Sequence, residues 1–378
     1  MNIERTCIKK HTIKEYCLSG VYLLSGVCLL GLAGILALLA RSAAGFSDWY
    51  YETVYSLLVS TIGRLMGAAP FSVVEVLLYL LILWVIVSAG RVVWKLIRRE
   101  NAGLRDFVGK VFVLVAALLF IYMACCGVNY YRTSFSESTG IHVDFYTSGE
   151  LAAVCMDLTS EVNNLAGQVE RDESGVMVYS REMKAEAVNA MINLAEDYPE
   201  LKGYYPKPKM LLVPQILSVQ KVTGIYSPFT IEANCNGDMT DYNVPFTACH
   251  ELSHLRGFMR EEEANFIAWL ACRESERVDF QYSGSLRGWI SCMNVLYRSD
   301  YNAWAQIRVR LNPLVEADLS ANRAYWAKFE GPVADAAQAV NDNYLKANGQ
   351  SDGIQSYGRM SDLIVAYYLN SNTNTYSD

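Results

Sequence analysis

One short motif in the sequence could bind a metal ion and activate water. Residues 250–254 read His-Glu-Leu-Ser-His, and on a helix positions i and i+4 project from the same face, so His250 and His254 can bind one ion. Imidazole nitrogen suits zinc, at about 2.0–2.1 Å. Glu251 lies roughly 100° further round the helix, where it could deprotonate a metal-bound water without ligating the metal. The motif therefore predicts a zinc (Zn2+) site with Glu251 as general base and then general acid.

A hydrolytic zinc site needs a third protein ligand and an open fourth position. Gly257 can end the motif helix in a left-handed conformation, which would turn the chain back at Glu261, Glu262 and Glu263. The pattern Glu-x-x-Ala-Asn favours Glu261 as the ligand, with Glu263 as the runner-up. Asn265 lies one turn after Glu261 and could hydrogen-bond a ligating histidine. The alternative role for Glu262 and Glu263 is a solvated first helical turn, where negative charge is favourable.

Such a site would also need groups that hold the substrate. Zinc peptidases usually add a donor that stabilises the oxyanion, and because no histidine follows His254, Tyr357 and Arg359 are the weak candidates. Packing is the commoner role of any one of 25 tyrosines. The strand-like segment 225–234 could pair with an extended substrate backbone, or it could be an internal strand with no substrate role.

Three long apolar runs precede this region. Residues 18–40 and 111–131 carry no charge, and residues 71–90 carry only Glu75, so each run can cross a hydrocarbon core of roughly 30 Å as a helix. The alternatives are buried helices of a soluble core or, for the first run, a cleaved signal peptide, whose apolar stretch is usually about 7–15 residues. Three such runs favour transmembrane helices.

The basic residues predict how these helices are oriented. Lys and Arg number four in residues 1–17, two in residues 41–70 and six in residues 91–110, which places the N-terminus and the second connection in the cytoplasm. A multi-pass protein of the plasma membrane then has residues 132–378 outside the cytoplasm. The aromatic-rich first connection is expected to contain an interfacial helix near 47–66, or else an ordinary loop.

The rest of the chain has the composition of a soluble α+β domain. Met210–Val213, Leu217–Val222 and Phe229–Ala233 are strand candidates. Helical periodicity predicts helices at about 149–169, 180–197, 244–256, 261–274, 284–298, 312–328, 330–347 and 358–369.

The net charge of −7 and pI near 5.3 argue against a nucleic-acid-binding surface. The ten cysteines contain no CxxC pair, so a zinc ribbon or thioredoxin motif is absent from the sequence.

The motif resembles that of the gluzincin peptidases, in which a second helix supplies Glu in a Glu-x-x-Ala-Asp pattern. Here Asn265 replaces that Asp. The spacing from His254 to Glu261 is shorter than in most gluzincins and closer to the metzincin pattern HExxHxxGxxH, which is matched up to Gly257 and lost at Arg260.

More closely, the chain resembles the DUF3810 family of uncharacterised bacterial membrane proteins. The stretches that carry this resemblance are Pro70-Phe71-Ser72 with Glu75, residues 226–234 and residues 245–266. It implies a fold and topology more than a substrate. The fold expected is a membrane domain over 1–131, with three transmembrane helices, followed by a zincin-like, helix-rich α+β domain with a small sheet over 132–378.

Together these features predict a membrane-anchored, extracytoplasmic zinc metallohydrolase. His250, His254 and Glu261 would hold the metal, and peptidase action on a peptide or protein of the envelope, beside the lipid bilayer, is the favoured activity; a peptidoglycan substrate stays open. An alternative is a zinc-containing sensor or binding module without general protease activity, although the cytoplasmic loops are too short for a signalling domain. A structural envelope protein with a fortuitous motif is the third possibility.

Overall fold

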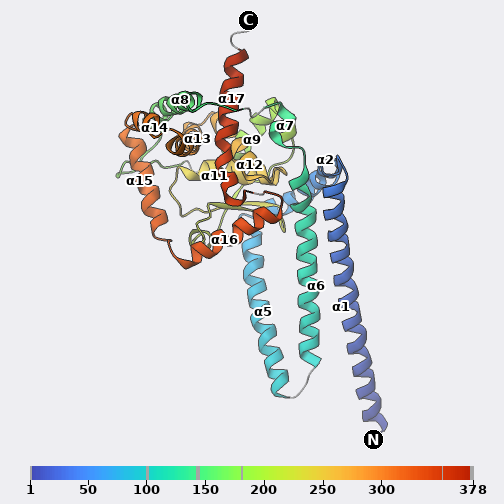
Figure 1. Cartoon of the computed structure of the whole chain (residues 1–378). Helices are drawn as coiled ribbons and strands as arrows, with labels where there is room; N and C mark the ends of the chain where they lie inside the picture. Colours follow the sequence, from blue (N-terminus) through green and yellow to red (C-terminus); the bar gives the residue numbers. More distant parts are fainter. Residues whose placement is uncertain (1, 99–101, 142–144, 180–181, 351, 375–378) are drawn as a thin grey trace.

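Three long helices form a stem beneath a mostly helical domain in the computed structural model (Figure 1). The structure describes residues 2–98, 102–141, 145–179, 182–350 and 352–374. The stem helices are α1 (Asn2–Ser42), α5 (Val73–Ile97) and α6 (Ala102–Cys125). Figure 1 places the N-terminus at the foot of the stem and the C-terminus on the opposite side of the domain.

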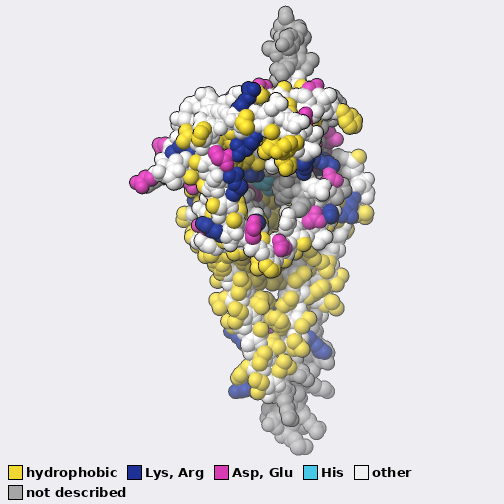
Figure 2. Space-filling view, turned by 60° about the vertical axis from the view of Figure 1, so that its left-hand side comes forward, with side chains coloured by type: hydrophobic (Ala, Val, Ile, Leu, Met, Phe, Trp, Pro, Cys, Tyr) yellow, Lys and Arg dark blue, Asp and Glu magenta, His cyan; other side chains and the backbone are white. Residues whose placement is uncertain are grey.

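Each stem helix is long and apolar enough to cross a membrane. The segments that meet this criterion are Gly20–Ser42, Val73–Ile97 and Leu104–Tyr131. Most of their side chains face outward, and Figure 2 shows the stem covered with hydrophobic side chains, as lipid contact would require. The three expected apolar helices are confirmed, the second and third extending beyond the predicted runs. Their orientation across the membrane stays a prediction.

The connection between the first two stem helices is helical and joins the domain core. It comprises α2 (Phe46–Tyr50), α3 (Ser56–Leu58) and α4 (Arg64–Gly67), with two π-helical segments, η1 (Tyr51–Tyr55) and η2 (Val59–Gly63), between them. We call residues 46–67 the connecting helix. Tyr55 and Val59 on its inner face are fully buried. The helix expected near 47–66 is therefore present, and its inner face packs against the domain.

The centre of the domain is a group of helices that pack against one another. They are α8 (Ser148–Ala166), α9 (Met183–Asp197), α11 (Asn243–Leu255), α12 (Glu261–Arg273) and α13 (Val278–Ser299). Apolar side chains are buried among them, including the fully buried Trp269, together with charged groups such as Glu251 and Glu261. Further helices surround this centre: α7 (Phe135–Thr139), α10 (Gln215–Ser218), α14 (Tyr301–Arg308), α15 (Pro313–Ala327), α16 (Pro332–Ala347) and α17 (Met360–Asn374). Short 3₁₀ turns are η3 (Gly127–Tyr131), η4 (Pro199–Leu201) and η5 (Gly353–Arg359).

A small sheet lies against the motif helix α11. It has the order β1-β3-β2, with β1 (Lys209–Met210) parallel and β2 (Gly224–Ser227) antiparallel to the central β3 (Glu232–Cys235). The expected α+β class, with one small sheet before the motif, is confirmed.

The strand positions predicted from sequence are partly wrong. Residues 217–222 form the end of α10 and a turn, because Pro214 adopts helical angles and starts a short helix; a short apolar run fits a helix or a strand equally well. The third expected strand is shifted to β3, since Ile231 has a positive φ of 52° and belongs to the turn before it.

A buried carboxylate joins the sheet to the second stem helix. Glu232 on β3 accepts hydrogen bonds from the backbone N–H groups of Val73 (3.1 Å) and Val74 (2.9 Å) at the start of α5. Lys209 on β1 forms an ion pair with the same carboxylate and donates to the Met66 carbonyl at 2.7 Å. An anion is favourable at a helix N-terminus because the unpaired N–H groups point toward it.

Glu75 makes the reciprocal contact from the stem. Its two carboxylate oxygens accept from the backbone N–H groups of Leu212 (2.7 Å) and Val213 (2.8 Å), and from Tyr79 Oη at 2.6 Å. The one charge in the second apolar run thus binds the segment that follows β1. Glu232 thus binds the start of α5 from the sheet, and Glu75 binds the segment after β1 from α5, so the helix and the sheet are joined by two carboxylates.

Lys209→Met tests how much this connection contributes to stability. The side chains of Lys209 and Glu232 are 5% and 1% exposed, so the substitution should lower the free energy of unfolding by about 3–5 kcal/mol, because it leaves a buried charge without its partner. Lys221→Met is the matched control, since the ion pair of Lys221 with Glu330 is exposed and should be worth about 0–1 kcal/mol. Denaturant unfolding of the full chain in detergent measures both, and equal losses would contradict the assignment.

Candidate metal centre

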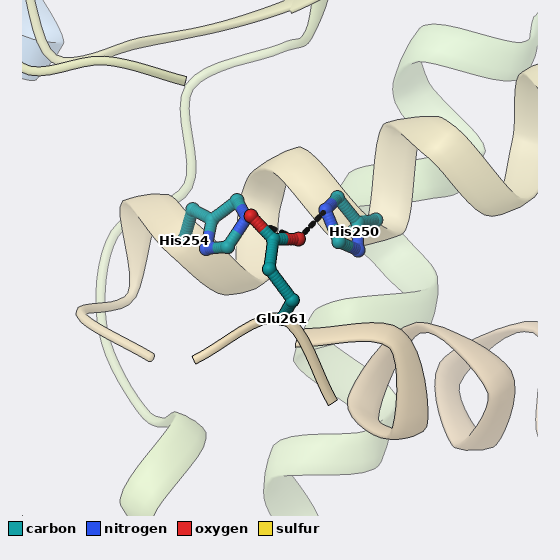
Figure 3. Close-up of side chains that lie close together, drawn as sticks. All are labelled: His250, His254 and Glu261. Carbon is teal, nitrogen blue, oxygen red and sulfur yellow. Dashed lines mark ion pairs between the residues drawn. The ribbon is translucent and has the colours of Figure 1, made fainter. Parts of the chain in front are cut away.

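Three side chains from two helices converge on one point in the domain (Figure 3). His250 and His254 project from α11, and Glu261 is the first residue of α12. Glu261 Oε2 lies 3.3 Å from His250 Nε2 and 3.6 Å from His254 Nε2. One donor atom from each residue lies within 4.8 Å of the other two. The three side chains are 11–12% exposed, so the site is nearly enclosed.

The spacing and chemistry of these atoms fit a zinc ion. Four ligands at about 2.0–2.1 Å in a tetrahedron lie roughly 3.3–3.4 Å from one another, close to the two nitrogen–oxygen distances found here. Glu261 Oε2 is buried, and no hydrogen-bond donor is assigned to it among the described residues. Two imidazoles and one carboxylate are also a ligand set that zinc uses in hydrolytic enzymes.

A sharp turn after α11 brings Glu261 back to the histidines. Gly257 has a φ of +89°. The N–H of Gly257 donates to the His254 carbonyl (2.8 Å) and that of Phe258 to the Ser253 carbonyl (3.2 Å), which is the hydrogen-bond pattern of a Schellman cap. The Phe258 carbonyl then accepts from His254 Nδ1 at 2.8 Å. This bond leaves the Nε2 lone pair of His254 facing Glu261.

The neighbouring acids face elsewhere. Glu263 accepts from the Phe135 N–H at 2.8 Å, and Glu262 accepts from Gln350 Nε2 at 2.7 Å. Of the three consecutive glutamates, Glu261 alone belongs to the histidine cluster. The expected hydrogen bond from Asn265 is not found: the Phe258 carbonyl serves His254, and no hydrogen bond joins Asn265 to either histidine in the described part of the chain.

The charges of the cluster reinforce one another. Burial works against a charged Glu261, but His254 and His250 outweigh it and hold the pKa of Glu261 well below its usual range. Burial likewise opposes protonation of His254, but Glu261 outweighs it and raises the pKa of His254 to about 9. Burial, followed by the charge of His254, lowers the pKa of His250. A divalent cation at this point would take the place of the proton that Glu261 favours on His254.

Glu251 is buried on the side of α11 that faces the sheet. Burial is the largest effect on its pKa and raises it to about 8, although the nearby charge of His254 and the Tyr226 N–H act in the opposite direction. Its Oε2 atom has no hydrogen-bond partner among the described residues. Gly224 makes room for this side chain, because a Cβ there would lie 2.5 Å from Glu251 Oε1.

The family model described as "Protein of unknown function (DUF3810)" matches residues 50–365. The chain belongs to the DUF3810 family. No curated protein and no solved structure matches it. The DUF3810 match spans the connecting helix, the sheet and all three candidate ligands, so the resemblance seen in the sequence is confirmed for the family.

Neither of the two expected oxyanion donors is confirmed. The side chain of Tyr357 lies outside the described part of this DUF3810 protein. Arg359 pairs with Asp352 and lines a cavity of about 290 Å³ with Arg260 and Glu262. Arg287 on α13 is a cation near His250, over the Phe246 ring that stacks on that histidine. Sequence reasoning missed Arg287, because a lone arginine 33 residues after the motif carries no pattern of its own.

Metal content tests the site directly. The full chain should bind about one zinc ion, and His250→Ala, His254→Ala and Glu261→Ala should each lose it, because a single deletion leaves two ligands. Glu263→Gln is the matched control and should keep the metal. Elemental analysis of protein purified with zinc measures the ratio; zinc retained in Glu261→Ala and lost in Glu263→Gln would reassign the third ligand.

Proposed function

We propose that this DUF3810 protein is a membrane-anchored zinc metallohydrolase, with peptidase as the favoured activity. The observation that carries the proposal is the convergence of His250, His254 and Glu261, with Glu251 buried one residue along the same helix. A zinc ion held there would supply Lewis acidity and would lower the pKa of a water molecule. A zincin-like domain is the corresponding fold proposal.

Glu251 suits the role of proton acceptor and then proton donor. It is enclosed between α11 and the start of β2, where water is scarce and its pKa is raised. A cation bound by the neighbouring ligands would favour the ionised carboxylate, so the group would be ready to accept a proton from the attacking water. The same carboxyl group could then pass that proton to the leaving amine.

The free edge of the sheet supports a peptide substrate. The Asn236 N–H donates to the Thr223 carbonyl at 2.8 Å, so these two residues form a hydrogen-bonded pair of the β2–β3 ladder. Hydrogen-bonded and non-hydrogen-bonded pairs alternate along an antiparallel ladder. Tyr226 and Ala233 therefore form a non-hydrogen-bonded pair, whose N–H groups point away from each other. The Tyr226 N–H therefore points to the side of β2 away from β3, and the Glu251 carboxylate lies close to the start of this strand. An extended peptide added along this edge would run past the metal ligands.

The attachment of the sheet to α5 bears on where the substrate would be found. Ser227 at the end of β2 pairs with Glu232, which binds the first residues of α5. The edge strand thus ends next to the start of a helix that could enter the bilayer. With the orientation that the basic residues predict, the site would lie at the outer membrane surface, facing peptides or proteins of the envelope.

Glu251→Gln tests the mechanism. It should keep zinc and lose hydrolysis by about 10²–10⁴-fold, since the amide cannot accept the proton. Glu262→Gln, on the next helix, removes the same charge away from the cluster and should keep activity. Peptide products from an envelope digest can be quantified by mass spectrometry. Unchanged hydrolysis in Glu251→Gln would remove the mechanism, whereas zinc binding without hydrolysis in the natural chain would favour the sensor or binding-module alternative.

Gly224→Ala tests the placement of Glu251. The new Cβ would lie 2.6 Å from Thr247 Cγ2 and 2.9 Å from the Asn234 carbonyl as well as against Glu251, so β2 or the carboxylate must move, at a cost of about 1–3 kcal/mol in stability. We expect reduced hydrolysis with zinc content unchanged. Gly237→Ala is the matched control, because its Cβ would meet only Met210 side-chain atoms at 3.4 Å or more. Equal activity of the two variants would contradict the placement.

A further inference from the structure

Arg287 lies near the candidate ligands on α13, a helix that supplies none of them. Its guanidinium carbon is 5.1 Å from the centre of the Phe246 ring, and Phe246 stacks on His250 with ring centres 6.4 Å apart and planes 23° apart. These separations place the guanidinium carbon within about 11.5 Å of the centre of the His250 ring. Its charge also contributes to the lowered pKa of His250, after the larger effects of burial and His254.

Arg287 differs from three other arginines of the domain in having no polar partner among the described residues. Arg171 pairs with Asp318 at 3.0 Å, Arg273 pairs with Glu161 at 3.1 Å, and Arg256 donates to the Lys202 carbonyl at 2.8 Å. For Arg287 the described residues provide neither a hydrogen bond nor a carboxylate, and the one ring that its guanidinium faces is that of Phe246. Its side chain is partly exposed, and a guanidinium stays protonated in proteins. The charge is therefore available to bind an anionic ligand that reaches it from solvent.

The cluster opens into a hollow on the surface. Figure 2 shows described histidine side chains within this hollow, with Lys and Arg side chains beside it. The described histidine side chains are those of His250 and His254, because the side chain of His11 and residue 142 lie outside the described part. The net charge of the chain is −7, so most of its surface is expected to repel anions. Basic groups beside this hollow make it more favourable to an anionic ligand than the rest of the surface.

We propose that Arg287 is a specificity-determining residue that binds a carboxylate group of the substrate. The assignment rests on the proposed peptidase function and adds the chemical class of its substrate: a peptide with a free carboxylate, terminal or side-chain, near the scissile bond. An extended peptide advances about 3.3 Å per residue, so the distance from the cluster to Arg287 corresponds to roughly three residues or fewer. The planar fork of arginine can bind a carboxylate with two parallel hydrogen bonds.

Binding measurements can test this apart from catalysis. The full chain in detergent, loaded with zinc and carrying Glu251→Gln to prevent turnover, is titrated by calorimetry with acetylated alanine hexapeptide amides. Each peptide contains one Glu and is compared with a peptide that has Gln at the same position. A further pair, one with a free C-terminal carboxylate and one with a C-terminal amide, tests the terminal carboxylate. We expect at least one pair in which the carboxylate peptide binds about tenfold tighter or more.

Three variants in the same background assign the effect. Arg287→Gln should abolish the preference. Arg287→Lys keeps the charge without the fork and should weaken the preference about threefold or more. Arg298→Gln, an exposed position on the same helix, should leave it unchanged. If Arg287→Gln fails to hold zinc, Arg287→Lys decides the question.

The assignment is overturned if no carboxylate pair differs in the parent chain, or if the preference persists in Arg287→Gln or is unchanged in Arg287→Lys. The proposed function fails separately. If the chain with natural Glu251 shows the carboxylate preference but no hydrolysis, the proposed peptidase function is contradicted and the role of Arg287 in binding stands. If it hydrolyses peptides without the preference, only the role of Arg287 is contradicted.

Discussion

The left-handed turn at Gly257 is the constraint on which the candidate site depends. If α11 continued, Glu261 would lie about 10 Å along its axis from His254. The turn is fixed from outside: Arg132 stacks 3.5 Å from the centre of the Tyr51 ring and 4.4 Å from that of Phe258, and it donates to the Arg256 carbonyl at 3.1 Å. Through Arg132, Tyr51 of the connecting helix thus helps to hold the turn that assembles the candidate metal ligands.

A second attachment reaches the site from the same connecting helix. Tyr55 donates to the Leu255 carbonyl at 2.9 Å and shares a hydrogen bond of 2.8 Å with Tyr226 on the edge strand. Glu232 on β3, which pairs with the end of the edge strand, binds the first residues of α5. The end of the motif helix and the strand beside Glu251 are therefore both bound to segments that precede residue 132. A domain cut at that point would lose these contacts, so the full chain is the proper object for metal and binding measurements.

The sequence could predict those parts of the molecule that rest on local rules. Apolar length predicted the stem helices, i and i+4 spacing paired His250 with His254, and a glycine three residues after His254 predicted the turn. The strand expected at residues 217–222 was wrong because helix and strand compete on equal terms in a short apolar run. Arg287 and Tyr55 could not be assigned roles, since their surroundings come from helices remote in sequence. The expected partner of a ligating histidine was a side chain, Asn265, but at His254 a backbone carbonyl takes that role, and any residue type supplies one.

The charges in the centre favour an ionic role over a purely structural one. Removing charged groups from water is costly, and well-packed apolar residues often replace a buried ion pair without loss of stability. Here the buried carboxylate of Glu261 faces two imidazoles, and a second carboxyl group, that of Glu251, is enclosed nearby. One oxygen of each of these two glutamates has no hydrogen-bond donor among the described residues. Such an arrangement is a poor way to fill a core. It becomes favourable when a divalent cation satisfies the nitrogens and the oxygen together, because the energy of binding then offsets the cost of burying the ligands.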